Sequence, residues 1–142
     1  MIRTGITISA LALALGQPAA LAQTAPPLNP AQAIAAAAAA GAGEVEGVFE
    51  FQVASTGASG FNVYLNSAAD YRDPTNLSIE LHPGALAPLR KTLGGEPEDL
   101  LKGKHVRVKG TARRVPIPRR DGTTYYQTRI DVDLAAQIEI LG

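Results

Sequence analysis

Residues 104–115, KHVRVKGTARRV, decide the fold class of this chain. Val106 and Val108 alternate with three basic side chains, and side chains two positions apart lie on the same face of a β-strand. The stretch therefore predicts a strand with one buried and one solvated face. Such strands belong to antiparallel sheets, because the strands of a parallel α/β sheet read as continuous apolar runs.

The same alternation recurs in four other segments. FNVYLN (61–66) places Phe61, Val63 and Leu65 on one face, and these side chains are expected in the core together with Phe49 and Phe51. The predicted strands are residues 44–54, 61–66, 77–81, 104–115 and 125–134, and a further extended piece is expected at 137–141.

Glycine, proline and small polar residues predict the connections between these strands. STGASG (55–60) is expected to form a flexible turn, and Gly47 to mark a bulge in the first strand. PIPRRDG (116–122) is expected to form the turn before the last strand. Residues 82–103 are the only helical stretch expected inside the domain. Five strands with one helical insert after the third predict an all-β, five-stranded OB-fold barrel over residues 44–142.

Residues 1–22 have the composition of an export signal. Arg3 precedes an apolar run over residues 6–15, and residues 20–22, Ala-Leu-Ala, have the small-x-small form of a cleavage site. The run is about half of the ~20 residues that span a bilayer as a helix. We therefore expect cleavage after Ala22, no stable membrane span afterwards, and a periplasmic or secreted protein.

Residues 23–43 are rich in Ala and Pro and carry no charge. Asn29 is placed to cap a short helix, with Pro30 at its first position and Gly41 just past its end. An Ala-rich helix of this length is marginal in water on its own. A linker and a short helix therefore both remain open for this segment.

The charges of the chain are balanced in number but not in position. The 13 Lys and Arg residues equal the 13 Asp and Glu residues, so bulk charge predicts no polyanion partner. Residues 102–120 nevertheless hold eight basic side chains and no acid, which is informative about surfaces rather than fold. In a closed OB barrel the first and fourth strands are neighbours, so their opposite charges are expected to pair. The residues concerned are Arg107 and Lys109 and, opposite them, Glu44, Glu46 and Glu50.

Four segments of the chain resemble small exported bacterial OB-fold domain proteins. Members of that group often carry a Phe/Tyr-Leu-Asn strand, a loop with a Tyr, an L-x-G-K-x-V-R-V-x-G strand and a closing Gln-Ile-x-(Val/Ile). The matching positions are Tyr64-Leu65-Asn66, Tyr71, Leu101 through Gly110, and Gln137 through Ile140, and the match spans roughly residues 60–141. The resemblance implies an OB fold and a nucleic-acid-binding-like role, because OB-folds generally bind oligonucleotides or oligosaccharides.

The usual ligand face of an OB barrel lies on its second and third strands, flanked by its first and fourth connecting loops. A single-strand binder combines a cationic groove for phosphates with aromatic planes for bases. The side chains expected on this face are Asn62, Tyr64, Asn66, Ser78 and Glu80, with Tyr125 and Arg129 from the fifth strand. The expected cationic rim is Arg113, Arg114, Arg119 and Arg120, for which the sequence offers no nearby acid except Asp121. The alternative for these arginines is a solvated loop without a ligand.

Other chemistry lacks the residues that it requires. The chain has no Cys, and His82 and His105 lie far apart in sequence, so no metal site and no cofactor is predicted. No Ser lies in a G-x-S-x-G turn, and STGASG lacks the Lys of a phosphate-binding loop. The chain is loosely similar to the barrel of thermonuclease-type enzymes, but their full set of carboxylates and paired arginines has no match here. No catalytic residue is assigned, and no enzymatic activity is expected.

Three hypotheses follow from the sequence. The first is a non-enzymatic exported binding module for single-stranded nucleic acid or an anionic polysaccharide. The second is an envelope module for protein-protein interaction or structure, in which the charges serve solubility. The weakest is a secreted nuclease-like enzyme.

Overall fold

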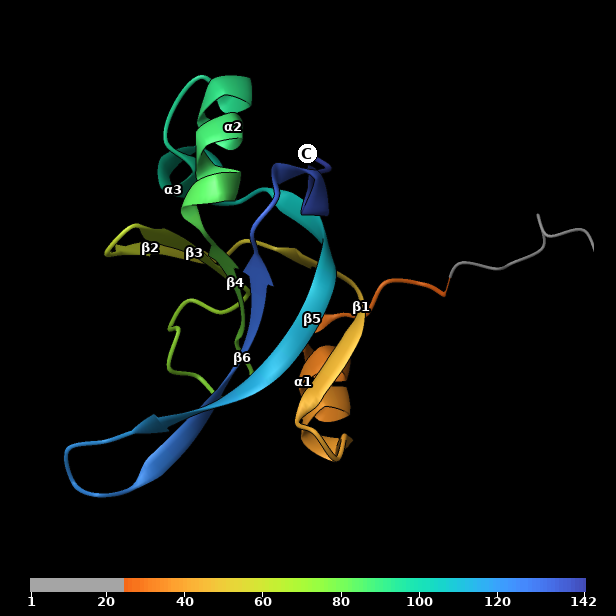
Figure 1. Cartoon of the computed structure of the whole chain (residues 1–142), viewed down its shortest axis with the longest axis vertical. Coiled ribbons are helices and arrows are strands. Elements are labelled where there is room, and N and C mark those ends of the chain that lie inside the picture. Colours follow the sequence, from red (N-terminus) through yellow and green to blue (C-terminus); the bar gives the residue numbers. More distant parts are fainter. Residues whose placement is uncertain (1–24) are drawn as a thin grey trace, which may run out of the picture.

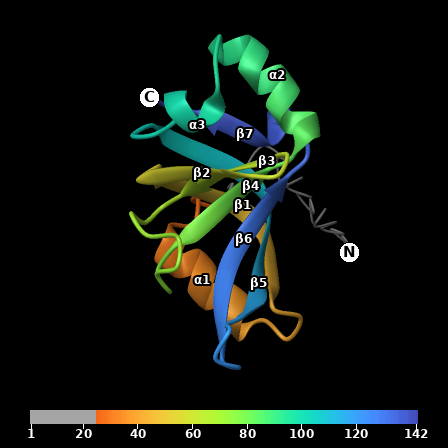
Figure 2. The same ribbon diagram turned by 90° about the vertical axis from the view of Figure 1, so that its left-hand side faces the viewer.

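The computed structural model describes residues 25–142, so the predicted export signal at residues 1–22 lies outside the described part. Within it the helices are α1 (Pro30–Ala39), α2 (Pro83–Leu93) and α3 (Pro97–Leu100), followed later by a 3-10 turn, η2 (Ala135–Gln137). The strands are β1 (Glu44–Gln52), β2 (Ser55–Ser59), β3 (Asn62–Asn66), β4 (Leu77–Leu81), β5 (His105–Pro118), β6 (Thr124–Val132) and β7 (Ile138–Ile140). Figures 1 and 2 show a strongly curved sheet with α2 and α3 at one end and α1 at the other. No helix of residues 25–142 has both the length and the apolar character needed to cross a bilayer.

The seven strands form one sheet in the hydrogen-bonded order β1-β5-β6-β4-β3-β2, with β7 paired to β5. The pairing of β4 with β6 is parallel and the other pairings are antiparallel. The two ends of this order, β1 and β2, are separated in the chain only by Val53 and Ala54. Within the described residues no ladder joins β1 to β2, so the sheet curls round without closing into a barrel. The molecule is mainly β, as predicted, and has a few helices. The extended piece expected at 137–141 contains β7, whereas β2 was not predicted.

The prediction of a turn at residues 55–60 is wrong. Ser55–Ser59 form β2, which pairs with β3 along its whole length. The reversal lies at Gly60 and Phe61, where Gly60 has a φ of 61°, a conformation that glycine adopts without steric cost. This tight turn leaves Phe61 86% exposed, so its predicted core position is also wrong.

The predicted bulge at Gly47 is absent. The register of β1 on β5 runs without interruption from Glu44 opposite Arg113 to Gln52 opposite His105, and it sets Gly47 opposite Gly110. A Cβ atom on Gly110 would lie 3.1 Å from Cγ2 of Ile130. The absence of a side chain at Gly110 therefore allows β5 to pack closely against β6.

The core fills the inside of the curved sheet. α2 contributes Leu86 and Leu89 at one end. The largest fully buried side chains are Phe49, Val53, Leu65, Leu77, Ile79, Leu81, Leu86, Leu101, Val106, Val108, Ile130 and Val132. The predicted inward faces of residues 77–81 and of Val106 and Val108 are therefore confirmed.

The described part of residues 23–43 contains a helix that packs on the sheet. The Asn29 side chain accepts a hydrogen bond from the Gln32 backbone N–H at 2.9 Å, and the Gln32 side chain accepts one from the Asn29 N–H at 3.0 Å. Each interaction satisfies a backbone donor at the helix start. Ala33 and Ala37 are fully buried, and Leu28 exchanges backbone hydrogen bonds with β1. Tertiary contact thus stabilises a helix that would be marginal alone.

Two polar interactions explain sequence motifs. Glu50 pairs with Arg107 across β1 and β5 at 3.1 Å, which confirms that part of the predicted charge pairing. Lys109 makes no ion pair within residues 25–142.

The Gln137 side chain accepts from the backbone N–H groups of Asp133 and Leu134, and donates to the Lys109 carbonyl, each at 3.0 Å. Gln137 therefore fastens the final turn to β5.

Candidate functional site

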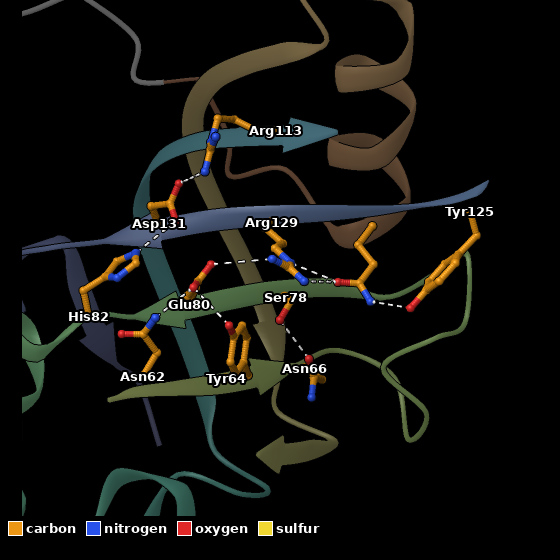
Figure 3. A network of polar contacts seen from close by, with 11 residues as sticks. Asn62, Tyr64, Asn66, Ser78, Glu80, His82, Arg113, Tyr125, Arg129 and Asp131 are labelled. Atoms are coloured by element: carbon orange, nitrogen blue, oxygen red, sulfur yellow. Dashed lines mark hydrogen bonds and ion pairs between the residues drawn. The ribbon is translucent and has the colours of Figure 1, made fainter. Parts of the chain in front are cut away.

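The outer face of β3, β4 and β6 carries a continuous set of polar side chains (Figure 3). Strand register produces this set, because residues opposite one another on neighbouring strands lie on the same face. One row joins Tyr64, Glu80 and Asp131. The next row joins Asn66, Ser78 and Arg129, and it continues to Arg113 on β5.

Glu80 is the centre of the first row and is only 9% exposed. Its Oε1 accepts hydrogen bonds from the Asn62 amide and the Tyr64 hydroxyl, both at 3.0 Å, and its Oε2 lies 4.0 Å from the Arg129 guanidinium. Partial burial and the hydrogen bond to Glu80 raise the pKa of Tyr64. The Tyr64 hydroxyl therefore stays neutral. The centroid of the Tyr64 ring lies 5.7 Å from Cζ of the Arg129 guanidinium.

Along β6 the polar contacts run from Arg129 toward the end of the β5–β6 hairpin. Arg129 donates to Oε1 of Gln127 from Nε at 2.9 Å and from Nη2 at 2.6 Å. Gln127 donates in turn to the Tyr125 hydroxyl at 3.2 Å. The Arg119 guanidinium stacks over the Tyr125 ring at 4.6 Å. The face thus presents two Arg–Tyr stacks connected by one glutamine.

A pocket of about 430 Å³ opens on this face beside the loop of residues 67–76. Its size is within the range of small-molecule sites, about 300–1,000 Å³. It is lined by β2 and by Tyr64, Asn66, Ala69, Tyr71, Asn76, Ser78, Gln127 and Arg129. The sequence analysis missed Gln127 and Asn76. The strand alternation that places Tyr125 and Arg129 on one face also places Gln127 there, whereas nothing in the loop sequence singles out Asn76.

The four arginines predicted as one cationic rim do not form a single group. Arg113 pairs with Asp131, so the expectation that it lacks an acidic partner is wrong. That partner was hidden because the register of β5 on β6 is not readable from the sequence. Arg114 lies on the opposite face of the hairpin, stacked over Tyr126 at 3.5 Å.

The end of the hairpin nevertheless keeps unneutralised positive charge. Within the described residues Arg114, Arg119 and Arg120 have no carboxylate within 4.0 Å. Asp121, the acid nearest in sequence, instead accepts hydrogen bonds from the backbone and hydroxyl of Thr123. Figure 1 shows this hairpin extending away from the rest of the sheet.

Asp131 joins Arg113 to His82 at the other end of the face. His82 Nε2 lies 3.0 Å from Asp131 Oδ1, and this hydrogen bond raises the pKa of His82. Partial burial of Asp131 opposes its ionisation, but the hydrogen bonds from His82 and Arg113 outweigh burial and lower its pKa. Glu80, His82 and Asp131 place ligand-type atoms within 4.8 Å of one another. Because Arg113 and Arg129 approach the same carboxylates, the cluster has the character of an ion-pair network rather than a cation site.

Comparisons with known proteins give a likeness of fold. No family model matches the chain, and no curated protein matches it in sequence. Among 19 solved chains that match in structure is a protein assigned as an aspartyl-tRNA synthetase from Leishmania major Friedlin, with a TM-score of 0.50 and 11% sequence identity. The match covers 87% of this chain and 22% of that one. The chain therefore corresponds to about a fifth of that protein, and at this identity only the fold is shared.

Proposed function

We propose that this protein is a non-enzymatic, exported binding module of the OB type, which holds single-stranded nucleic acid on the outer face of β3, β4 and β6. The OB assignment is supported by the strand order. When β1 and β2 are counted as two halves of one bent strand, five strands follow one another round the sheet and return to the first. An OB-fold is a five-stranded, partly open Greek-key barrel of this kind. Export is supported by the signal-like composition of residues 1–22.

The observation that carries the ligand assignment is the pair of Arg–Tyr stacks on one face. Single-strand binders use aromatic planes for bases, at about 1–3 kcal/mol per stacked base, and cations for the backbone. Here Tyr64 with Arg129 and Tyr125 with Arg119 supply both. Tyr64 lies on β3, the second OB strand, Arg129 and Tyr125 lie on β6 beside β4, and Arg119 lies in the loop between β5 and β6, which flanks an OB ligand face. The free charges at the hairpin end supply further phosphate contacts. The fold likeness to a tRNA synthetase adds an analogy, which assigns no residue.

The test is binding of a fluorescent single-stranded oligonucleotide of about 12 nucleotides, measured by anisotropy across about 50 to 200 mM salt. We expect affinity to fall as salt rises. The slope of log K against log salt should fall in magnitude by about 1.4 when Arg119 and Arg120 are changed to Gln, because each phosphate contact contributes about 0.7 on single strands.

The matched control removes two charges from the other end of the molecule, by changing Lys91 and Lys102 to Gln. These side chains belong to α2 and to the connection before β5, and they are exposed. The control should keep the wild-type slope. Absence of binding at low salt, or equal slopes for both double variants, would remove the proposed function.

A protein-interaction module is the second candidate, and one observation favours it. Phe61 is 86% exposed at the tip of the β2–β3 hairpin, and aromatic side chains such as Phe are enriched in protein–protein interfaces. This candidate expects a protein partner whose binding is lost in Phe61→Ser and survives in the Arg119 and Arg120 double variant. The reverse pattern would favour nucleic acid.

A further inference from the structure

For the pocket beside residues 67–76, protein contacts determine which side-chain atoms of the lining are donors and which are acceptors. Asn76 is the starting point, because both of its amide atoms contact backbone groups. Its Oδ1 accepts from the Ala68 N–H at 3.0 Å, and its Nδ2 donates to the Tyr71 carbonyl at 3.3 Å. A backbone N–H only donates and a carbonyl only accepts, so the orientation of this amide is determined.

The orientation of Asn76 determines that of Asn66. Nδ2 of Asn76 lies 3.4 Å from Oδ1 of Asn66, and the Ser78 hydroxyl donates to the same oxygen at 2.9 Å. The oxygen of Asn66 therefore faces its protein neighbours, and its Nδ2 faces away from them (Figure 3).

Asn66 is thus a buried donor directed into the pocket. The residue is 4% exposed and lines the cavity, and within residues 25–142 its Nδ2 has no hydrogen-bond acceptor. Nδ2 itself is accessible from the cavity, because Glu98 Oε2 is the one fully buried side-chain atom without a partner in these residues. This N–H pair is therefore available to an acceptor atom of a ligand that enters the pocket.

A second donor lines the same pocket. Arg129 has five N–H groups; Nε and Nη2 each donate one hydrogen bond to Gln127, and Nη1 lies 4.0 Å from Oε2 of Glu80, beyond hydrogen-bond distance. Tyr71, 55% exposed at the rim, adds an aromatic plane. A ligand that fits this site is planar and presents acceptor atoms to Asn66 and Arg129.

We propose that this pocket binds the carbonyl edge of a nucleobase, so that the protein prefers thymine, uracil or guanine to adenine. This inference rests on the proposed function and names the part of the ligand that the face selects. Thymine and uracil present carbonyl oxygens and guanine presents O6 with N7. Adenine also has ring-nitrogen acceptors, but on its Watson–Crick and Hoogsteen edges the amino group lies beside them, so one of the two protein donors, Asn66 or Arg129, would face a donor. Arginine paired with carbonyl acceptors of bases is a common specific contact in nucleic-acid recognition.

The experiment compares oligo(dT) with oligo(dA) of equal length at one salt concentration. We expect oligo(dT) to bind about 5- to 150-fold more tightly, the range set by one well-formed base contact. Asn66→Asp keeps the size of the side chain and the acceptor for Ser78 and Asn76, but it replaces the donor by an acceptor. It should weaken oligo(dT) and abolish the preference.

The control variant is Asn29→Asp, which makes the same amide-to-acid change at the start of α1. Asp retains the helix cap there, so stability and base preference should remain those of the wild type. Loss of preference in this control as well would overturn the inference, because the effect would then be one of net charge.

A second measurement leaves the protein unchanged. An oligonucleotide with difluorotoluene in place of thymine keeps the shape of the base and lacks its carbonyl acceptors. We expect it to bind as weakly as oligo(dA). Binding equal to that of oligo(dT), or equal affinity for oligo(dT) and oligo(dA), would overturn the inference and leave the proposed function standing; no binding of any oligonucleotide at low salt would overturn both.

Discussion

Gly110→Ala tests how closely β5 packs where it leaves β1 for β6. A Cβ atom added at Gly110 would lie 3.1 Å from Cγ2 of Ile130 and 3.5 Å from Nε2 of Gln137. Ile130 is fully buried, so it has little freedom to move away. Adding a methyl group to a well-packed core costs about 1–3 kcal/mol.

Part of that cost is offset in the unfolded chain. Replacing Gly by Ala reduces the conformational entropy of the unfolded state and stabilises a protein by about 0.4–1 kcal/mol where the native site tolerates the methyl. The net loss for Gly110→Ala therefore lies between about 0 and 2.6 kcal/mol, with a midpoint of about 1.3 kcal/mol. At about 4 °C per kcal/mol for a domain of this size, the midpoint corresponds to a fall in Tm of roughly 5 °C.

The control for this prediction is Gly57→Ala, also within a strand. No heavy atom lies within 4 Å of a Cβ added at Gly57, so only the entropic gain remains and Tm should be unchanged or slightly raised. Differential scanning calorimetry of the three proteins measures the difference. A Gly110→Ala protein as stable as the Gly57→Ala control would refute the close packing of β5 on β6.

Three further perturbations have outcomes that follow from single contacts. The hydrogen bond to Asp131 raises the pKa of His82. The stabilisation that this hydrogen bond contributes is therefore complete below the ordinary His pKa of about 6.5 and is lost as pH rises through the raised value. Between pH 6 and pH 8, denaturant unfolding should show a smaller loss of stability in His82→Asn than in the wild type. Asn29→Ala removes the cap of α1 and should cost about 1 kcal/mol, measured by the same method; no change would mean that burial alone holds the helix. Gln137→Ala leaves the Lys109 carbonyl and two turn N–H groups without this side chain, so amide hydrogen exchange should accelerate in η2 and β7.

The sequence predicted the strands whose apolar side chains alternate. Val63 and Leu65 are buried, while Asn62, Tyr64 and Asn66 share the other face, as the period of two requires. β2 was missed because Ser55–Ser59 contain only small residues, of which Thr56 alone favours strands, and the strand conformation comes from pairing with β3. Phe61 was misplaced because a two-residue turn, rather than hydrophobicity, determines its direction.

The candidate site was predictable in its residue types and not in its pairings. Tyr125 and Arg129 were placed on the ligand face from the alternation of side chains along the predicted strand alone. The neutralisation of Arg113 by Asp131 depends on the β5–β6 register, which a sequence does not specify across a long hairpin. The donor direction of Asn66 depends on Asn76, ten residues away in the chain, and on backbone groups of the intervening loop.

The most direct test of the nucleic-acid interface is a titration of the ¹⁵N-labelled protein with oligo(dT), followed by NMR. We predict shifts in the side-chain signals of Asn66 and Arg129 and in the backbone amides of β3 and β6, with α2 unaffected. Shifts confined to α2 and α3, or none on β3 and β6 when oligo(dT) is bound, would contradict binding on this face.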